Sequence, residues 1–134
     1  MKTTFKSMYV VVMALMLLTS PGFSFDKSEK VISKARAIIE KASPDDWESY
    51  AKAAELCVRK NVNLAEAKAW LDTSLKIKNS VLANEVAGDY YILNKLYDKA
   101  IDHYVKSMLL VKEKDFYADT SGLQEKIERA KAKR

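Results

Sequence analysis

Apolar residues recur along this chain at helical spacing from residue 26 to the C-terminus. In residues 26–42 they follow one another at steps of one, three and four, which places them on one stripe of a helix. Helices are predicted over residues 26–42, 44–60, 64–78, 81–93, 97–114 and 121–133. The most strand-like run, residues 89–93, is short and lies inside one of these helices. The pattern therefore predicts an all-α protein.

Polar residues between these segments predict where the helices begin. Three pairs have capping-box spacing, with Glu or Gln three residues after a short polar side chain: Asp26 with Glu29, Asn63 with Glu66, and Ser121 with Gln124. Ser43 is expected to cap the second helix, with Pro44 at its first position. Asp45 and Asp46 then face the positive end of that helix dipole.

An internal repeat organises the middle of the chain. Residues 48–80 align without a gap on residues 81–113, at a spacing of 33 residues. The identical pairs are Ala54/Ala87, Asn61/Asn94, Ala67/Ala100 and Ser74/Ser107. Repeats of this length are typical of stacked helix pairs, each too small to bury its apolar face alone.

The second repeat resembles the tetratricopeptide repeat family, in which a W-x₂-L-G-x₂-Y helix is followed by an A-x₃-F helix. The matching strings are Asn84-x₂-Ala87-Gly88-x₂-Tyr91 and Ala100-x₃-Tyr104. Gly88 and Ala100 are expected where the two helices of the repeat approach closely. Tyr91 and Tyr104 are expected to fill the space toward the next helix pair.

The first repeat departs further from that pattern, because Glu55 replaces the Gly and Val58 replaces the Tyr. Neither repeat closes with Pro, and the resemblance covers about half of the chain. The length of the chain leaves room for one domain, residues 25–134. The resemblance implies that this domain is a short α-solenoid of antiparallel helix-turn-helix repeats. Residues 26–42 are then an extra N-terminal helix, and residues 121–133 a C-terminal capping helix.

The first 24 residues follow a different pattern. Lys2 and Lys6 precede the uncharged apolar run 8–18, and the small-x-small site Gly22-Phe23-Ser24 follows. This arrangement is typical of a secretory signal peptide, so residues 1–24 are predicted to be removed on export to the periplasm or the medium. The apolar run has 11 residues, whereas a membrane-spanning helix needs about 20. An uncleaved N-terminus that tethers the chain to the membrane, facing the periplasm, is the alternative.

Charge and cysteine content narrow the classes of partner. The chain has 23 basic and 18 acidic residues, and loss of Lys2 and Lys6 lowers its formal net charge from +5 to +3. That surplus is too small and too dispersed for a nucleic-acid-binding surface. Cys57 is the only cysteine, so no internal disulfide can form, and we expect its thiol to be buried.

No catalytic or metal-binding constellation is visible, and we expect no enzyme activity and no cofactor. His103 is the only histidine and is expected on the outer side of its helix or between helices. Trp70 and Tyr90 lie off the predicted core stripe and are the best candidates for an aromatic contact. The basic residues near the C-terminus are interpreted as a solvated helix end, with anionic lipid headgroups as the alternative contact.

The leading interpretation is an exported interaction module that binds a peptide or protein in a concave groove. The resemblance implies that the first helix of each repeat lines this groove. The implied residues are Ser49, Lys52, Leu56, Arg59, Leu82, Glu85, Asp89 and Ile92. Two cations face two carboxylates, which indicates a ligand of mixed charge. Leu56 and Asp89 stand where chaperone-binding members carry an Asn, so an internal segment is expected rather than a free acidic C-terminus.

A structural homo-oligomer is the runner-up interpretation. A stack of two repeats is short, and pairing with a second copy would complete its core. Exposed large residues such as Trp70 and Tyr90 would favour that arrangement.

Overall fold

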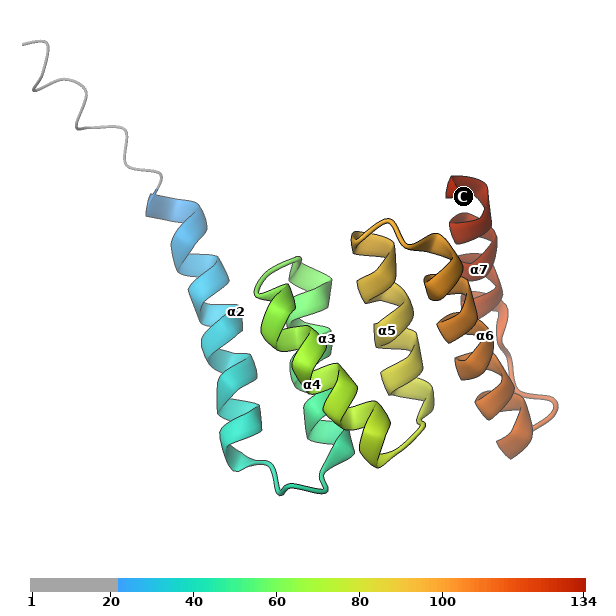
Figure 1. Ribbon diagram of the computed structural model, residues 1–134, viewed down its shortest axis with the longest axis horizontal. Helices are drawn as coiled ribbons and strands as arrows, with labels where there is room; N and C mark the ends of the chain where they lie inside the picture. Colours follow the sequence, from blue (N-terminus) through green and yellow to red (C-terminus); the bar gives the residue numbers. More distant parts are fainter. Residues whose placement is uncertain (1–21) are drawn as a thin grey trace, which may run out of the picture.

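The computed structural model describes residues 22–134, and its regular structure there is entirely helical. The helices are α2 (Gly22–Lys41), α3 (Trp47–Lys60), α4 (Leu64–Ile77), α5 (Val81–Leu93), α6 (Tyr97–Lys114) and α7 (Ser121–Lys133). They pack mostly in sequence order, each antiparallel to the one before it (Figure 1). The predicted signal segment, residues 1–24, lies outside the described residues except for its last three, which belong to the first turn of α2.

The core of the molecule consists of two clusters of buried side chains. The first cluster joins α2, α3, α4 and α5 and is rich in alanine; Ala35, Ala54 and Ala67 are fully buried in it. The second cluster joins α6 to α7 through Ala100, Tyr104, Leu123 and Ile127. The ring of Tyr91 packs against both clusters. The outer helices α2 and α7 thus bury the apolar faces that the two inner helix pairs leave uncovered.

The same hydrogen bond ties the two helices of each inner pair together. In the α3–α4 pair, the Ser74 hydroxyl donates to the carbonyl oxygen of Trp47 at 2.7 Å. In the α5–α6 pair, the Ser107 hydroxyl donates to the carbonyl oxygen of Val81 at 2.9 Å. Both serine side chains are fully buried. The identity of these two residues in the aligned repeats therefore has a structural counterpart.

Gly88 lies where α5 meets α6. A Cβ atom at this position would come within 2.2 Å of Cε1 in the Tyr104 ring. Tyr104 is only 2 % exposed, so its ring has no room to move away. The expectation that Gly88 is small because the helices approach closely is confirmed, as is the burial of Ala100.

The predicted start of α3 is wrong by three residues. The helix begins at Trp47, and Asp46 rather than Ser43 is its N-cap, accepting a hydrogen bond from the Ser49 N–H at 3.1 Å. The Ser43 carbonyl accepts from the Asp46 N–H at 3.0 Å, which closes a four-residue turn before the helix. Pro44 occupies the second position of this turn, which its fixed φ angle also suits.

Of the other predicted caps, those at Asp26 and Ser121 are wrong, and the position of the one at Asn63 is confirmed. Asp26 lies inside α2, where it pairs with Lys30 at 3.2 Å instead of starting the helix. Asn63 is the N-cap of α4, but its side-chain amide donates to the Glu66 carboxylate at 2.5 Å and caps no backbone N–H. The N-cap of α7 is Thr120 rather than Ser121. At Asp26 and Ser121 the local motif is present, but the helix begins at a different residue. Asn63 is the N-cap as predicted, and its side chain is bonded to Glu66.

Within residues 22–134, no helix is both long and apolar enough to cross a membrane.

Candidate partner-binding site

Helix α5 lies at the centre of the molecule and packs against α3, α4 and α6. Four of the predicted groove residues lie on it at steps of three, four and three, which places them on one stripe: Leu82, Glu85, Asp89 and Ile92. All four are half-buried. We call this stripe the α5 face.

Lys126 of α7 neutralises part of the α5 face. Its ammonium group lies 2.9 Å from the Glu85 carboxylate and 2.8 Å from that of Asp89. Burial lowers the pKa of Lys126, but the hydrogen bonds to Asp89 and Glu85 outweigh burial, and the net pKa is raised. Lys126 therefore stays charged and leaves the two carboxylates with about one unit of negative charge between them.

Tyr104 of α6 also contacts these charged groups. Its hydroxyl donates to Asp89 Oδ1 at 2.7 Å, and the Lys126 ammonium lies 5.5 Å from the centroid of its ring. Burial raises the pKa of Tyr104, and the hydrogen bond to Asp89 raises it further, because the phenolate form would face a carboxylate. One carboxylate thus connects α5 to both α6 and α7.

A pocket opens at each end of the α5 face. The pocket toward the C-terminal end of α5 has a volume of about 280 Å³ and is lined by Asp89, Ile92, Tyr104, Lys126 and Arg129 among others. The pocket toward the N-terminal end has a volume of about 360 Å³, and Leu82 and Glu85 contribute to its wall. Both volumes are near the lower end of what ligand-binding pockets offer, ~300–1,000 Å³. Each pocket can take one or two side chains of a partner.

Of the four predicted groove residues on α3, Lys52 and Arg59 are exposed, whereas Ser49 and Leu56 are half-buried. Lys52 pairs with Glu48 at 2.6 Å, and Arg59 lies 3.9 Å from Glu55, both within one helical turn. Such exposed pairs contribute little to stability, so both cations can turn toward a ligand. Leu56 packs against the first cluster.

His103 is held between α5 and α6. Its ring stacks on Tyr91 at a centroid distance of 5.4 Å, and its Nδ1 lies 3.0 Å from the Asn84 side-chain oxygen. The Asn84 amide already donates to Asn79 and Ser80, so its oxygen must accept and His103 Nδ1 carries the proton. Burial lowers the pKa of His103, and Lys106 lowers it further. Of the two placements expected for this histidine, the interhelical one is confirmed and the one on the outer side of the helix is wrong.

Cys57 is fully buried in the first cluster, as predicted. Burial raises the pKa of its thiol, which keeps the sulfur protonated and unreactive.

The positions of Trp70 and Tyr90 differ from the sequence interpretation, which placed both residues outside the core. Both pack, partly buried, against the first cluster, because side chains from neighbouring helices extend the core beyond a single stripe.

Sequence reasoning missed two residues that organise the site. Lys126 falls on the apolar stripe of α7, between Leu123 and Ile127, and a cation on a buried stripe is a signal for a buried acidic partner. Asn84 occupies a position where the tetratricopeptide pattern has a large apolar residue, and it is 1 % exposed. Its three hydrogen-bond partners explain why a polar side chain is stable there.

Over the described range, no three His, Cys, Asp or Glu side chains are grouped to hold a metal ion. No protein-family model, curated protein or solved structure matches this chain.

Proposed function

We propose that this chain is an exported, non-enzymatic interaction module of the cell envelope, built as a short tetratricopeptide-like α-solenoid. It binds an internal segment of mixed charge from a protein partner along the α3 and α5 helices. The α5 face, with a pocket at each end, is the observation that carries the proposal.

Two features of the helix pairs support the solenoid part of the proposal. The buried serines at 74 and 107 make equivalent bonds, so α3–α4 and α5–α6 are built alike. The first helices of the two pairs, α3 and α5, also pack directly on each other. Stacked repeats create extended binding surfaces through this kind of contact.

The charges on the two helices set the polarity of the ligand. Glu85 and Asp89 retain net negative charge beside Lys126, whereas Lys52 and Arg59 on α3 are exposed. Basic groups of the ligand are therefore expected near α5 and acidic groups near α3. Complementary charges of this kind mainly set specificity and association rate.

The test begins with selection of binding peptides from a random display library, using protein expressed from the full-length sequence. The double variant Lys52→Glu, Arg59→Glu should weaken binding of the selected peptides by more than about tenfold at low salt. The control is Lys76→Glu with Lys106→Glu, which changes the net charge equally on exposed positions of α4 and α6. If peptides still bind the Lys52→Glu, Arg59→Glu variant, or if the control variant loses binding equally, the surface of α3 and α5 is not the binding site.

Export is tested independently of binding. Protein from a secreting host should begin near Phe25 when its N-terminus is sequenced. Recovery of Met1 in the membrane fraction would instead support the tethered form.

A further inference from the structure

The loop between α6 and α7, residues 115–120, carries two adjacent aromatic side chains that no other part of residues 22–134 covers. Phe116 is 74 % exposed and Tyr117 is 91 % exposed. We call this segment the aromatic loop. Exposed aromatic side chains are the commonest anchors of protein–protein interfaces, because they bury a large area at a small cost in side-chain entropy.

Internal hydrogen bonds fix the aromatic loop even though its two rings are exposed. The Lys112 ammonium donates to the carbonyl oxygens of Phe116 at 3.0 Å and Ala118 at 2.7 Å. Asp115 accepts from the Tyr117 N–H at 3.0 Å, and the two rings meet edge to face with centroids 5.5 Å apart. A loop held in one conformation loses little entropy on binding, so its aromatic pair is preorganised for docking.

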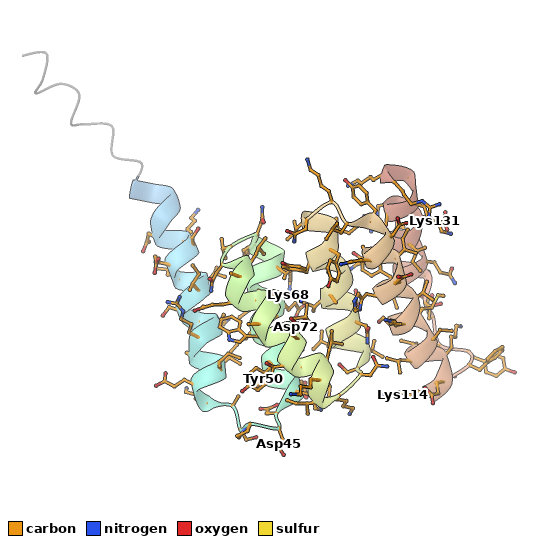
Figure 2. All side chains as sticks on the ribbon, viewed as in Figure 1. Asp45, Tyr50, Lys68, Asp72, Lys114 and Lys131 are labelled. Atoms are coloured by element: carbon orange, nitrogen blue, oxygen red, sulfur yellow. The ribbon has the colours of Figure 1, made fainter. Side chains whose placement is uncertain are left out.

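The pocket at the N-terminal end of α5 opens at the same end of the molecule. The connections α4–α5 and α6–α7 both lie along the lower edge in Figure 1. Lys114, which is labelled in Figure 2, directly precedes the aromatic loop and also lines this pocket. Its apolar wall comes from Trp47, Val81, Leu82 and Leu110. A volume of about 360 Å³ is enough to take one aromatic side chain.

Charges on the pocket and on the loop are complementary. Glu48 and Glu85 in the pocket wall are already paired with Lys52 and Lys126. Among residues 22–134, no carboxylate forms an ion pair with the pocket cations, Lys78 and Lys114. The Lys78 ammonium lies 4.5 Å from the centroid of the Trp47 ring in the same wall. The aromatic loop carries two carboxylates beside its rings, those of Asp115 and Asp119.

We propose that two copies of this chain form a two-fold symmetric dimer, in which the aromatic loop of each copy inserts into the N-terminal α5 pocket of the other. A second copy is the occupant because one chain presents both complementary halves at one end, as a self-complementary two-fold interface requires. The dimer does not depend on the proposed function. It occupies one end of the α5 face, since Leu82 and Glu85 line the same pocket.

Sedimentation equilibrium on protein expressed from the full-length sequence measures the association. The wild-type chain should dimerise, and Phe116→Ala with Tyr117→Ala should weaken dimerisation by more than about tenfold. Lys78→Glu with Lys114→Glu should weaken it in the same direction from the pocket side. Leu93→Ala with Leu96→Ala, exposed residues at the opposite end of the molecule, is the control and should leave dimerisation unchanged.

Mixing the variants tests the reciprocal geometry. The loop variant and the pocket variant together should form heterodimers more readily than either variant forms homodimers, because one intact loop–pocket contact is restored. Three outcomes would overturn the proposal: a wild-type chain that stays monomeric up to about 1 mM, dimerisation that survives the loop variant, or a mixture that restores nothing. A monomer that binds neutral lipid vesicles through the two aromatic residues would likewise overturn it, and would place the loop at a membrane surface.

Discussion

Gly88 and Tyr104 fit together so closely that one added carbon atom at position 88 would collide with the tyrosine ring. The hydroxyl of that ring is also held by Asp89, which prevents a simple rotation away. At the residue scale, therefore, the spacing of α5 and α6 depends on the absence of a single methyl group.

Gly88→Ala should destabilise the fold by about 1–3 kcal/mol, because overpacking outweighs the higher helix propensity of alanine. Gly88→Leu should destabilise it at least as much. Gly122→Ala is the matched control: nothing lies within 4 Å of its added Cβ atom. It should be neutral or stabilising by up to about 1 kcal/mol. Urea unfolding measures all three variants, and equal effects of Gly88→Ala and Gly122→Ala would show that the Tyr104 contact is unimportant.

His103 makes stability depend on pH. Its pKa in the folded protein is lowered by burial, so the unfolded chain binds a proton more readily. The stabilisation is complete above the ordinary histidine pKa of about 6.5 and is lost as the pH falls through that value toward the folded pKa. Urea midpoints at about pH 7.5 and 5.5 should differ less for His103→Gln than for the wild type. An unchanged difference would assign the pH dependence to other groups.

At the scale of elements, each inner helix pair is joined by one buried hydroxyl–carbonyl bond as well as by alanine contacts. Ser74 lies in the last turn of α4, whereas Ser107 lies past the middle of α6. Each bond fixes its helix against the first residue of the partner helix. The bond sets the axial register of the pair, which apolar packing alone determines less strictly.

Ser74→Ala and Ser107→Ala should each destabilise the protein by about 0.5–1.5 kcal/mol, the usual net value of one hydrogen bond. Their effects should add, because the two serines have no partner in common. Ser33→Ala on the exposed side of α2 is the control, with an expected change within about 0.5 kcal/mol. A neutral result at both buried serines would mean that the equivalent bonds do not stabilise the pairs.

In the molecule as a whole, Lys126 links α7, the last helix, to α5, the central helix. It lies between Glu85 and Asp89, so α7 is connected to α5 as well as to α6. Lys126 therefore links the α5 face to α7, the last helix.

Lys126→Met should destabilise the fold by about 1–2 kcal/mol, because it leaves two half-buried carboxylates without their cation. Hydrogen exchange in α7 should rise more than in α3. Lys131→Met is the control, since Lys131 is exposed and pairs with Glu128 inside α7 (Figure 2). Its effect should stay within about 0.5 kcal/mol. Similar losses of stability for both variants would show that the ion pairs between Lys126 and α5 do not stabilise the fold.

Local sequence signals located the helices well and the helix starts less well. All six predicted helices are present, since the apolar period and the scarcity of Gly and Pro are properties of each segment alone. The caps at Asp26, Ser43 and Ser121 are wrong because several nearby residues can cap equally well. Packing of the whole helix then selects which of them does.

Helical periodicity and residue size are local properties of the chain, so they were enough to predict the all-α class, the order of the helices and the burial of Ala54, Cys57 and Gly88. Which charged groups form pairs could be seen only in the packed helices. Lys126 pairs with Glu85 and Asp89, which lie 41 and 37 residues earlier in the chain, and His103 bonds to Asn84 on another helix. Periodicity fixes the face on which a side chain lies, whereas its partner depends on how the helices pack against one another.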